Sequence, residues 1–260
     1  MNRKVLSIVL AIAVVVGALF GVKAQYDIAI SALFYDPRAH LFVVNAQPWV
    51  MHVRDAARWL ITLIVAPAFL TPFCKLIWPK RRMLVAARAA LFLVVTMALG
   101  PGLLANVILK DHWGRVRPID VTALGGTGRF TAWWDPRGEC PDNCSFIAGE
   151  PSGAFWTLAP AAVAPPQWRA FAYGGAVAFG AALGLLRIAG GGHFFTDVVF
   201  AGVFIYLLIW ATHGFLFRWP ATRITDNTLE WPLVWAGEAL GSARAALARR
   251  FFGRGQRTPS

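Results

Sequence analysis

Charged residues are scarce in this sequence: Asp, Glu, Lys and Arg together make up 15% of its 260 residues. Soluble domains average about a quarter. Hydrophobic residues instead make up 57%, and the mean hydropathy is +0.55. We know of no soluble arrangement that buries so much apolar sequence in so short a chain. The composition therefore excludes an ordinary soluble domain.

Cysteine is also scarce, and its three copies exclude a disulfide-rich scaffold. Cys140 and Cys144 have zinc-like spacing, but no second ligand pair follows them, so we expect no metal site and no other cofactor. If the segment that carries these two cysteines faces an oxidising compartment, their thiols are expected to form a small local disulfide just before Ser145. The alternative is two free thiols.

Acidic residues number 13 against 25 basic ones, yet the basic residues are not interleaved with aromatics as in a nucleic-acid groove. The excess instead predicts a membrane topology. With the N-terminus in the cytoplasm and six spans, 15 basic and three acidic residues fall inside, so the whole net charge of +12 lies on one side. We therefore expect both termini in the cytoplasm and no nucleic-acid partner.

Long apolar runs recur along the chain, on the scale of the roughly 20 residues that a transmembrane helix needs. We predict an all-α polytopic membrane protein, a bundle of six transmembrane helices in the inner (plasma) membrane. The spans are Val5–Gly21, Trp59–Trp78, Met83–Leu109, Gly153–Ala164, Ala170–Leu186 and Phe194–Phe217.

The first and last parts of the chain need separate interpretation. The first span resembles a signal peptide, but its apolar run is long and Lys23 would lie awkwardly near a cleavage site, so we expect an uncleaved anchor. Residues 1–217 are expected to form the membrane domain. Residues 218–260 are expected to form a basic cytoplasmic tail with an amphipathic helix on the lipid surface.

Two short stretches place five ionisable residues at the ends of apolar spans, on the outer face in this topology. Lys110 and Arg117 lie in the first stretch, and Arg187, His193 and Asp197 in the second. Ionisable residues in such positions are costly in lipid and often mark a site. Each cation alone would suit a snorkelling role. Together they fit a phosphate held by Lys and Arg beside a nucleophilic His, which a carboxylate four residues later would orient.

These stretches resemble the first and third motifs of the type 2 phosphatidic acid phosphatase family, which shares its site with vanadium haloperoxidases. Lys110-x6-Arg117-Pro118 looks like the first motif, and Arg187-x5-His193-x3-Asp197 looks like the third. The likeness covers about residues 104–202, and the six-span layout is similar to the bacterial membrane members. It implies that Lys110, Arg117 and Arg187 bind phosphate, that His193 is the nucleophile and that Asp197 orients it.

The central motif departs from the family pattern. In Ser145-Phe-Ile-Ala148-Gly149-Glu150, Ala148 stands where the family has a phosphate-binding Ser, and Glu150 stands where it has the His that protonates the leaving oxygen. Gly149 is retained as a phosphate contact. A rival alignment, four residues on, makes Ser152 a secondary candidate.

Glu150 could serve as the acid only if burial raised its pKa. The alternatives are a substrate with a better leaving group, such as a diphosphate, or a slow or inactive relative.

The sequence thus predicts a lipid phosphatase that works without metal through a phosphohistidine, with a site on the outer, periplasmic face. By resemblance, its substrate is lipid A, a polyprenyl diphosphate, phosphatidylglycerol phosphate or phosphatidic acid. One alternative is an inactive lipid-phosphate-binding membrane protein. The other is a vanadate-dependent haloperoxidase, against which the six spans argue.

Overall fold

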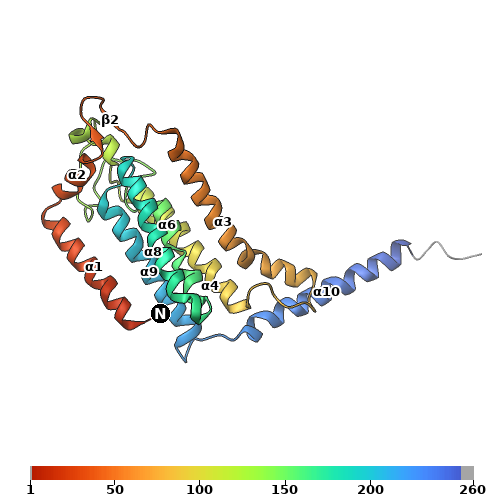
Figure 1. Ribbon diagram of the computed structural model, residues 1–260. Helices are drawn as coiled ribbons and strands as arrows, with labels where there is room; N and C mark the ends of the chain where they lie inside the picture. Colours follow the sequence, from red (N-terminus) through yellow and green to blue (C-terminus); the bar gives the residue numbers. More distant parts are fainter. Residues whose placement is uncertain (1, 253–260) are drawn as a thin grey trace, which may run out of the picture.

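A computed structural model describes the backbone of residues 2–252 and the side chains of residues 2–247, which form a helical bundle with one long helix leaving it (Figure 1). The all-α class is confirmed. The α-helices are α1 (Arg3–Val22), α2 (Gln25–Ala32), α3 (Pro48–Ile77), α4 (Ala87–Met97), α5 (Lys110–His112), α6 (Gly149–Phe155), α7 (Leu158–Val163), α8 (Pro166–Ala189), α9 (Phe195–His213) and α10 (Asp226–Phe252). The remaining elements are the π-helical segments η1 (Ala98–Leu109) and η4 (Gly214–Arg218), the 3-10 turns η2 (Pro118–Asp120) and η3 (Thr122–Leu124), and the paired strands β1 (Tyr35–Asp36) and β2 (Leu41–Phe42).

Five helical stretches of the described chain are long and apolar enough to cross a membrane, where the sequence predicted six. They are Arg3–Val22, Pro48–Ile77, Ala87–His112, Pro166–Ala189 and Phe195–Arg218.

The predicted fourth span is instead the pair of short helices α6 and α7. Pro160 lacks the N–H that a continuous helix would use, and α7 ends just before Pro165. This pair packs against α8, α9, η1 and α4, and Trp156 between its two helices is fully buried. Since protein rather than lipid surrounds it, the pair need not be long or uniformly apolar.

Helix α3 begins at Pro48, well before the start predicted at Trp59. Proline suits the first position of a helix, because its fixed φ is helical and its missing N–H would have no partner there. The early start places Arg54 within a helix, where the sequence predicted the outer connection between the first two spans.

The third span runs without a break from α4 through η1 into α5 and ends at the first predicted motif. Pro101 interrupts the regular hydrogen bonding, and the Asn106 amide donates to the Pro101 carbonyl at 2.6 Å. Lys110 therefore lies at the end of a helix anchored in the bundle.

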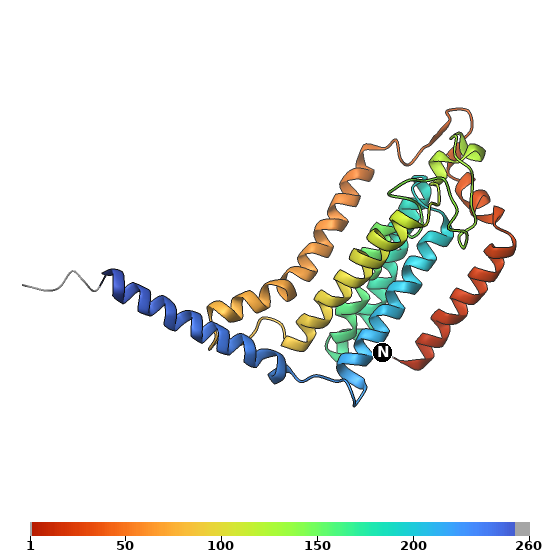
Figure 2. The ribbon, with the colours of Figure 1, turned by 180° about the vertical axis from the view of Figure 1, so that it is seen from behind.

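The two ends of the bundle differ. One end carries α2, the hairpin and the long irregular segment 113–148, and the other carries the start of α1 and the start of α10 (Figure 1). Seen from behind, α1 and α3 flank the central helices on opposite sides (Figure 2).

Helix α10 is tied to the bundle by Lys75–Glu230 at 2.5 Å and Arg88–Asp226 at 3.8 Å. Trp231 and Trp235 on this helix are exposed. The predicted division at residue 217 remains a prediction, and residues 253–260 of the predicted tail lie outside the described part.

Candidate active site

Separate segments bring the predicted site residues together at the end of the bundle that carries α2. Lys110 lies at the start of α5, Arg117 just before η2, and Arg187 in the last turn of α8. The positive charges of all three act on His193, which lies just before α9. The cations of both motifs and the imidazole therefore share one site.

The ring of His193 is 2% exposed and is held by a backbone carbonyl. Its Nδ1 lies 2.7 Å from the carbonyl oxygen of Ser145. A carbonyl oxygen can only accept a hydrogen bond, so Nδ1 carries the proton and the lone pair of the neutral ring is on Nε2. This arrangement gives Nε2 the lone pair that a nucleophilic role would require.

The predicted direct hydrogen bond from His193 to Asp197 is not formed, since Nδ1 and Oδ2 are 3.9 Å apart. The carbonyl of Ser145 takes that position instead. Asp197 accepts hydrogen bonds from the Ser145 hydroxyl at 2.5 Å and from the Phe194 N–H at 2.8 Å. Its carboxylate therefore acts on His193 through Ser145.

Behind this contact lies a fully buried set of charges that the motifs do not include. The guanidinium of Arg115 donates to Asp197 at 2.5 Å and to Asp27 at 2.8 Å. The Thr196 hydroxyl bridges Arg115 and Asp27, since it accepts a hydrogen bond from Arg115 at 2.8 Å and donates one to Asp27 at 2.6 Å. We call this set the polar core; its members are Arg115, Asp27, Asp197, Thr196 and Ser145, all at most 1% exposed.

Sequence reasoning missed Arg115 and Asp27. Arg115 lies among the unspecified positions of the first motif, and Asp27 lies on α2, far from any motif. The available signal was general: a charge close to an apolar span needs a partner of opposite sign.

Glu150, predicted as the acid, is paired with a second cation that the sequence did not single out. The Arg54 guanidinium donates to both Glu150 oxygens at 2.5–3.1 Å, and Arg187 lies 3.8 Å away. Burial raises the pKa of the Glu150 carboxyl, but the Arg54 hydrogen bond and the charge of Arg187 outweigh burial, so this pKa lies below its usual value. Without substrate, Glu150 is ionised and is not a proton donor.

The charge of Glu150 therefore acts on four cations. We call them the cationic cluster: Lys110, Arg117, Arg187 and Arg54. Like charges at this density repel one another unless an anion lies between them.

The disulfide loop orients one member of this cluster. Cys140 and Cys144 are joined by a disulfide with Cα atoms 5.7 Å apart. Within the loop, the carbonyl oxygen of Asn143 accepts two hydrogen bonds from Arg117, at 2.7 and 3.1 Å, and its side-chain oxygen accepts a third at 2.8 Å. The loop thus fixes the direction of the Arg117 guanidinium.

The two phosphate contacts predicted from the central motif have different surroundings. A Cβ on Gly149 would lie 2.7 Å from Asn106 Oδ1 and 3.4 Å from Lys110 Nζ, so only glycine fits beside this lysine. Ser152 is fully buried, and its hydroxyl donates to the Ala148 carbonyl at 2.8 Å, which leaves its proton no role toward a phosphate.

The glycine run 190–192 serves a packing role in this structure. Its three N–H groups close the end of α8 by donating to carbonyls of residues 186–188. A Cβ on Gly192 would lie 2.2 Å from Arg187 Nη2. The run therefore makes room for the Arg187 guanidinium, and its N–H groups are bonded to the end of α8.

Burial and charge both favour the neutral form of His193. Burial lowers its pKa most, the charges of Arg187, Arg117 and Lys110 lower it further, and the bond to Ser145 opposes them only in part. The pKa of His193 lies well below 6.5. The ring is therefore neutral at pH 7, the form that a nucleophile needs.

Comparison with known proteins agrees with the motifs. The family model described as "PAP2 superfamily" matches residues 89–221. A lipid A 4'-phosphatase of Francisella tularensis subsp. novicida is 32% identical over 208 residues, which cover 76% of this chain and 90% of that protein.

Lipid A 4'-phosphatases of Rhizobium leguminosarum and Rhizobium etli are 36% and 35% identical over shorter regions. These cover 40% and 39% of this chain, and 45% and 40% of the respective relatives. No solved structure matches the chain.

The family model covers half of the chain, and the Francisella relative is matched over nearly its whole length. The predicted membership is confirmed: this chain belongs to the PAP2 superfamily, the type 2 phosphatidic acid phosphatases.

Proposed function

We propose that this protein is a lipid phosphatase that removes the 4'-phosphate of lipid A, or of a closely related phosphorylated glycolipid, through a phosphohistidine intermediate. One observation carries the activity: three cations, Lys110, Arg117 and Arg187, act on a buried neutral imidazole whose Nδ1 is held as a donor. The similarity to three lipid A 4'-phosphatases supports the choice of substrate.

In the first step Nε2 of His193 attacks phosphorus, the N–P bond forms and the bond to the sugar oxygen breaks. Charge on the three equatorial oxygens is neutralised by the cationic cluster, with Arg187 as a bidentate donor, Arg117 donating through Nη1 and Lys110 as a point charge. The ring becomes positive as the bond forms. The Ser145 carbonyl stabilises that charge directly, and Asp197 does so through Ser145.

The departing sugar oxygen needs a proton, and Glu150 is the group that supplies it. A bound phosphate monoester brings a charge of about −1.5 to −2 next to this carboxylate and competes for its two arginine partners. The pKa of Glu150 then rises from its low resting value, and the carboxyl takes up a proton from solvent for transfer to the leaving oxygen. In the second step Glu150 accepts a proton from water, whose oxygen attacks phosphorus and releases His193.

An apolar groove gives the lipid chains a path to this site. Two cavities, one of about 410 Å³ between α3 and α8 and one of about 430 Å³ between α3, α7 and α8, share Leu60 and Phe179. The cavity of about 410 Å³ is lined by Val53 and Leu186, which directly precede Arg54 and Arg187 in the sequence. A phosphate on the cationic cluster therefore has its acyl chains next to this groove.

The predicted location is part of the proposal. The protein spans the inner membrane with its site at the periplasmic face and both termini in the cytoplasm, since the basic residues gather at the other end of the bundle. Residues 1–217 form the membrane domain, and the tail from residue 218 lies at the cytoplasmic surface through α10.

Phosphate release by the detergent-purified protein tests the activity and its substrate. The panel is lipid A, phosphatidic acid, phosphatidylglycerol phosphate and a polyprenyl diphosphate, with mass spectrometry to show which phosphate lipid A loses. We expect fastest release from the 4' position of lipid A and none from His193→Ala, whereas the exposed control His52→Ala retains the rate. Equal rates on all four lipids would remove the proposed specificity. No release from any lipid would favour an inactive phosphate-binding relative.

A leaving-group series tests the role of Glu150. Glu150→Gln is expected to lower turnover of lipid A about 100- to 10,000-fold, the usual value of a general acid. The same variant should hydrolyse an aryl phosphate with an acidic phenol at nearly the wild-type rate, because that group leaves without a proton. Glu139→Gln, an exposed residue of the outer loop, serves as the control. Equal losses on both substrates would assign Glu150 a purely positioning role.

A further inference from the structure

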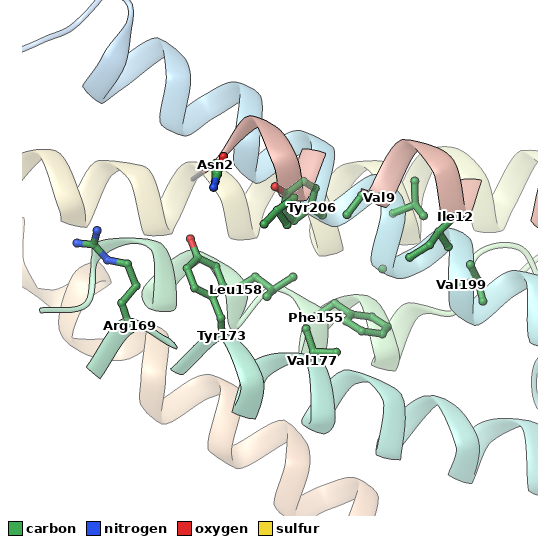
Figure 3. A pocket seen from close by; sticks show the side chains of 13 residues that line it. Asn2, Val9, Ile12, Phe155, Leu158, Arg169, Tyr173, Val177, Val199 and Tyr206 are labelled. Atoms are coloured by element: carbon green, nitrogen blue, oxygen red, sulfur yellow. The ribbon is translucent and has the colours of Figure 1, made fainter. Parts of the chain in front are cut away.

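A third cavity, of about 710 Å³, lies between α1, α8 and α9, away from the groove beside α3 (Figure 3). Most of its wall is apolar. The aliphatic and aromatic residues that line it are Val5, Val9, Ile12, Phe155, Leu158, Val177, Val199 and Val203.

One end of this cavity is polar, and two hydroxyl groups there have no hydrogen-bond partner in the described part of the chain. Tyr206 is only 5% exposed, and the hydroxyls of Tyr206 and Tyr173 are buried without a hydrogen bond to any residue that the structure describes. Figure 3 shows both side chains at the end that also holds Asn2 and Arg169. Buried hydroxyls normally have a hydrogen-bond partner, so these two are available to donate to an acceptor that enters the cavity.

The same end is positively charged. Arg169 donates from Nε and Nη2 to the Ala164 carbonyl and lies near enough to act on Tyr173, and Arg218 acts on Tyr206. None of the 13 described residues that line the cavity is acidic. Basic pockets between transmembrane helices at the cytoplasmic side are suited to anionic lipid headgroups.

We propose that this cavity binds one anionic diacyl phospholipid from the leaflet opposite the candidate active site. The headgroup phosphate accepts hydrogen bonds from Tyr173, Tyr206 and Arg169, and one acyl chain lies along the valines of α1 and α9.

The direction of the cavity separates this lipid from the substrate. Its polar end lies at the start of α1, whereas Val199 at its other end is two residues from Asp197. A headgroup at the polar end therefore belongs to the opposite leaflet from a phosphate on the cationic cluster. The proposal does not depend on the activity proposed above.

Such a lipid would fix the first half of α1. The second half is already held, because Trp133 donates to the Gly17 carbonyl at 3.2 Å and the rings of Phe20 and Phe195 are 5.2 Å apart. Near the start of the helix, Val5 and Val9 face the cavity instead. Lipid occupancy should therefore raise the thermal stability of the whole protein, since α1 then packs along its full length.

Native mass spectrometry of the full chain in micelles doped with phosphatidylglycerol or phosphatidylcholine tests the site. We expect wild type to retain one phosphatidylglycerol and about tenfold less phosphatidylcholine, because both lipids offer the phosphate but Arg169 and Arg218 repel the choline cation. Tyr173→Phe with Tyr206→Phe should reduce phosphatidylglycerol retention by about the same factor. Val203→Trp, which fills the cavity, should abolish it.

Two controls keep the outcomes distinct. Tyr26→Phe removes the hydroxyl of an exposed tyrosine on α2, beyond the other end of α1, and should retain lipid as wild type does. His193→Ala should also retain it, so a failure of the proposed catalysis leaves this test unaffected. Equal retention of the two lipids, or retention that neither the paired tyrosine variant nor Val203→Trp reduces, would overturn the proposal, as would the absence of any retained lipid.

Discussion

The polar core and the cationic cluster meet at His193, and their charges are balanced in different ways. In the polar core one guanidinium, Arg115, lies between two carboxylates, and every group is buried and hydrogen-bonded. In the cationic cluster Glu150 pairs with two of the four cations, Arg54 and Arg187, and the cations outnumber the carboxylate that lies among them. The first arrangement is complete as it stands, and the second is completed by an anion.

Because of this difference, we expect the polar core to contribute mainly to stability and the cationic cluster mainly to function, although both lie next to His193. A buried ion pair contributes little net stability while intact, but removal of one partner leaves an uncompensated buried charge. A cluster of like charges costs stability until a substrate neutralises it. Changes in the polar core should therefore affect folding first, and changes in the cationic cluster should affect activity first.

The largest effect is expected from Arg115→Met. It leaves Asp27 and Asp197 buried without their cation, which should destabilise the protein by about 3–5 kcal/mol. Thermal unfolding in detergent measures the change, with Arg129→Met in the exposed loop as the control. A variant as stable as wild type would show that the polar core does not hold this end of the bundle.

Arg187→Gln should have the opposite profile. Loss of one preorganised phosphate donor should lower kcat/KM about 100- to 1,000-fold. The unfolding temperature should stay the same or rise, because one of four repelling cations is gone. The exposed Lys23→Gln serves as the control for a lost cation. A large loss of stability with unchanged kinetics would reverse the assignment of the two regions.

A smaller effect concerns the pH dependence. Because the folded-state pKa of His193 lies well below 6.5, the neutral ring persists into acid, and the acidic limb of kcat/KM due to His193 should lie below pH 6.5. Arg117→Gln removes one of the charges that lower this pKa, so that limb should move up by roughly half to one pH unit. The substrate's own ionisation is common to both profiles and cancels in the difference. An unmoved limb would show that the charge of Arg117 does not lower the pKa of His193.

The smallest effect is expected from the paired change Cys140→Ser and Cys144→Ser. It loosens Asn143 and so the direction of Arg117, while the short loop contributes little to folding. We expect KM to rise about three- to tenfold with kcat nearly unchanged, because the contact between Arg117 and the phosphate is weakened and not lost. Cys74→Ser is the control. A fall in kcat alone would indicate that the loop acts on the chemical step.

The sequence predicted the bundle and the cations because both have residue patterns. Apolar runs of membrane length gave five of the spans, and motif spacing brought Lys110, Arg117 and Arg187 to one imidazole. It did not predict that α6 and α7 would be short, because their enclosure by other helices depends on packing, which hydropathy does not record.

The contacts behind His193 were beyond sequence reasoning for a related reason. Its Nδ1 bonds to the backbone of Ser145, and a carbonyl has no signature in the residue types. Asp27 reaches Arg115 only because α2 folds back over the start of α9. Arg54 could have been placed earlier, since Pro48 is a sign of a helix start ahead of it.

The most direct test of the central claim is to look for the covalent intermediate. Wild-type protein is mixed with lipid A, quenched in alkali within a single turnover and digested, and the phosphorylated peptide is sequenced by mass spectrometry. The account predicts a phosphoryl group on Nε2 of His193, absent from His193→Ala and longer-lived in Glu150→Gln, which cannot accept the proton of the attacking water. A phosphoryl group on another residue, or phosphate release by His193→Ala, would contradict it.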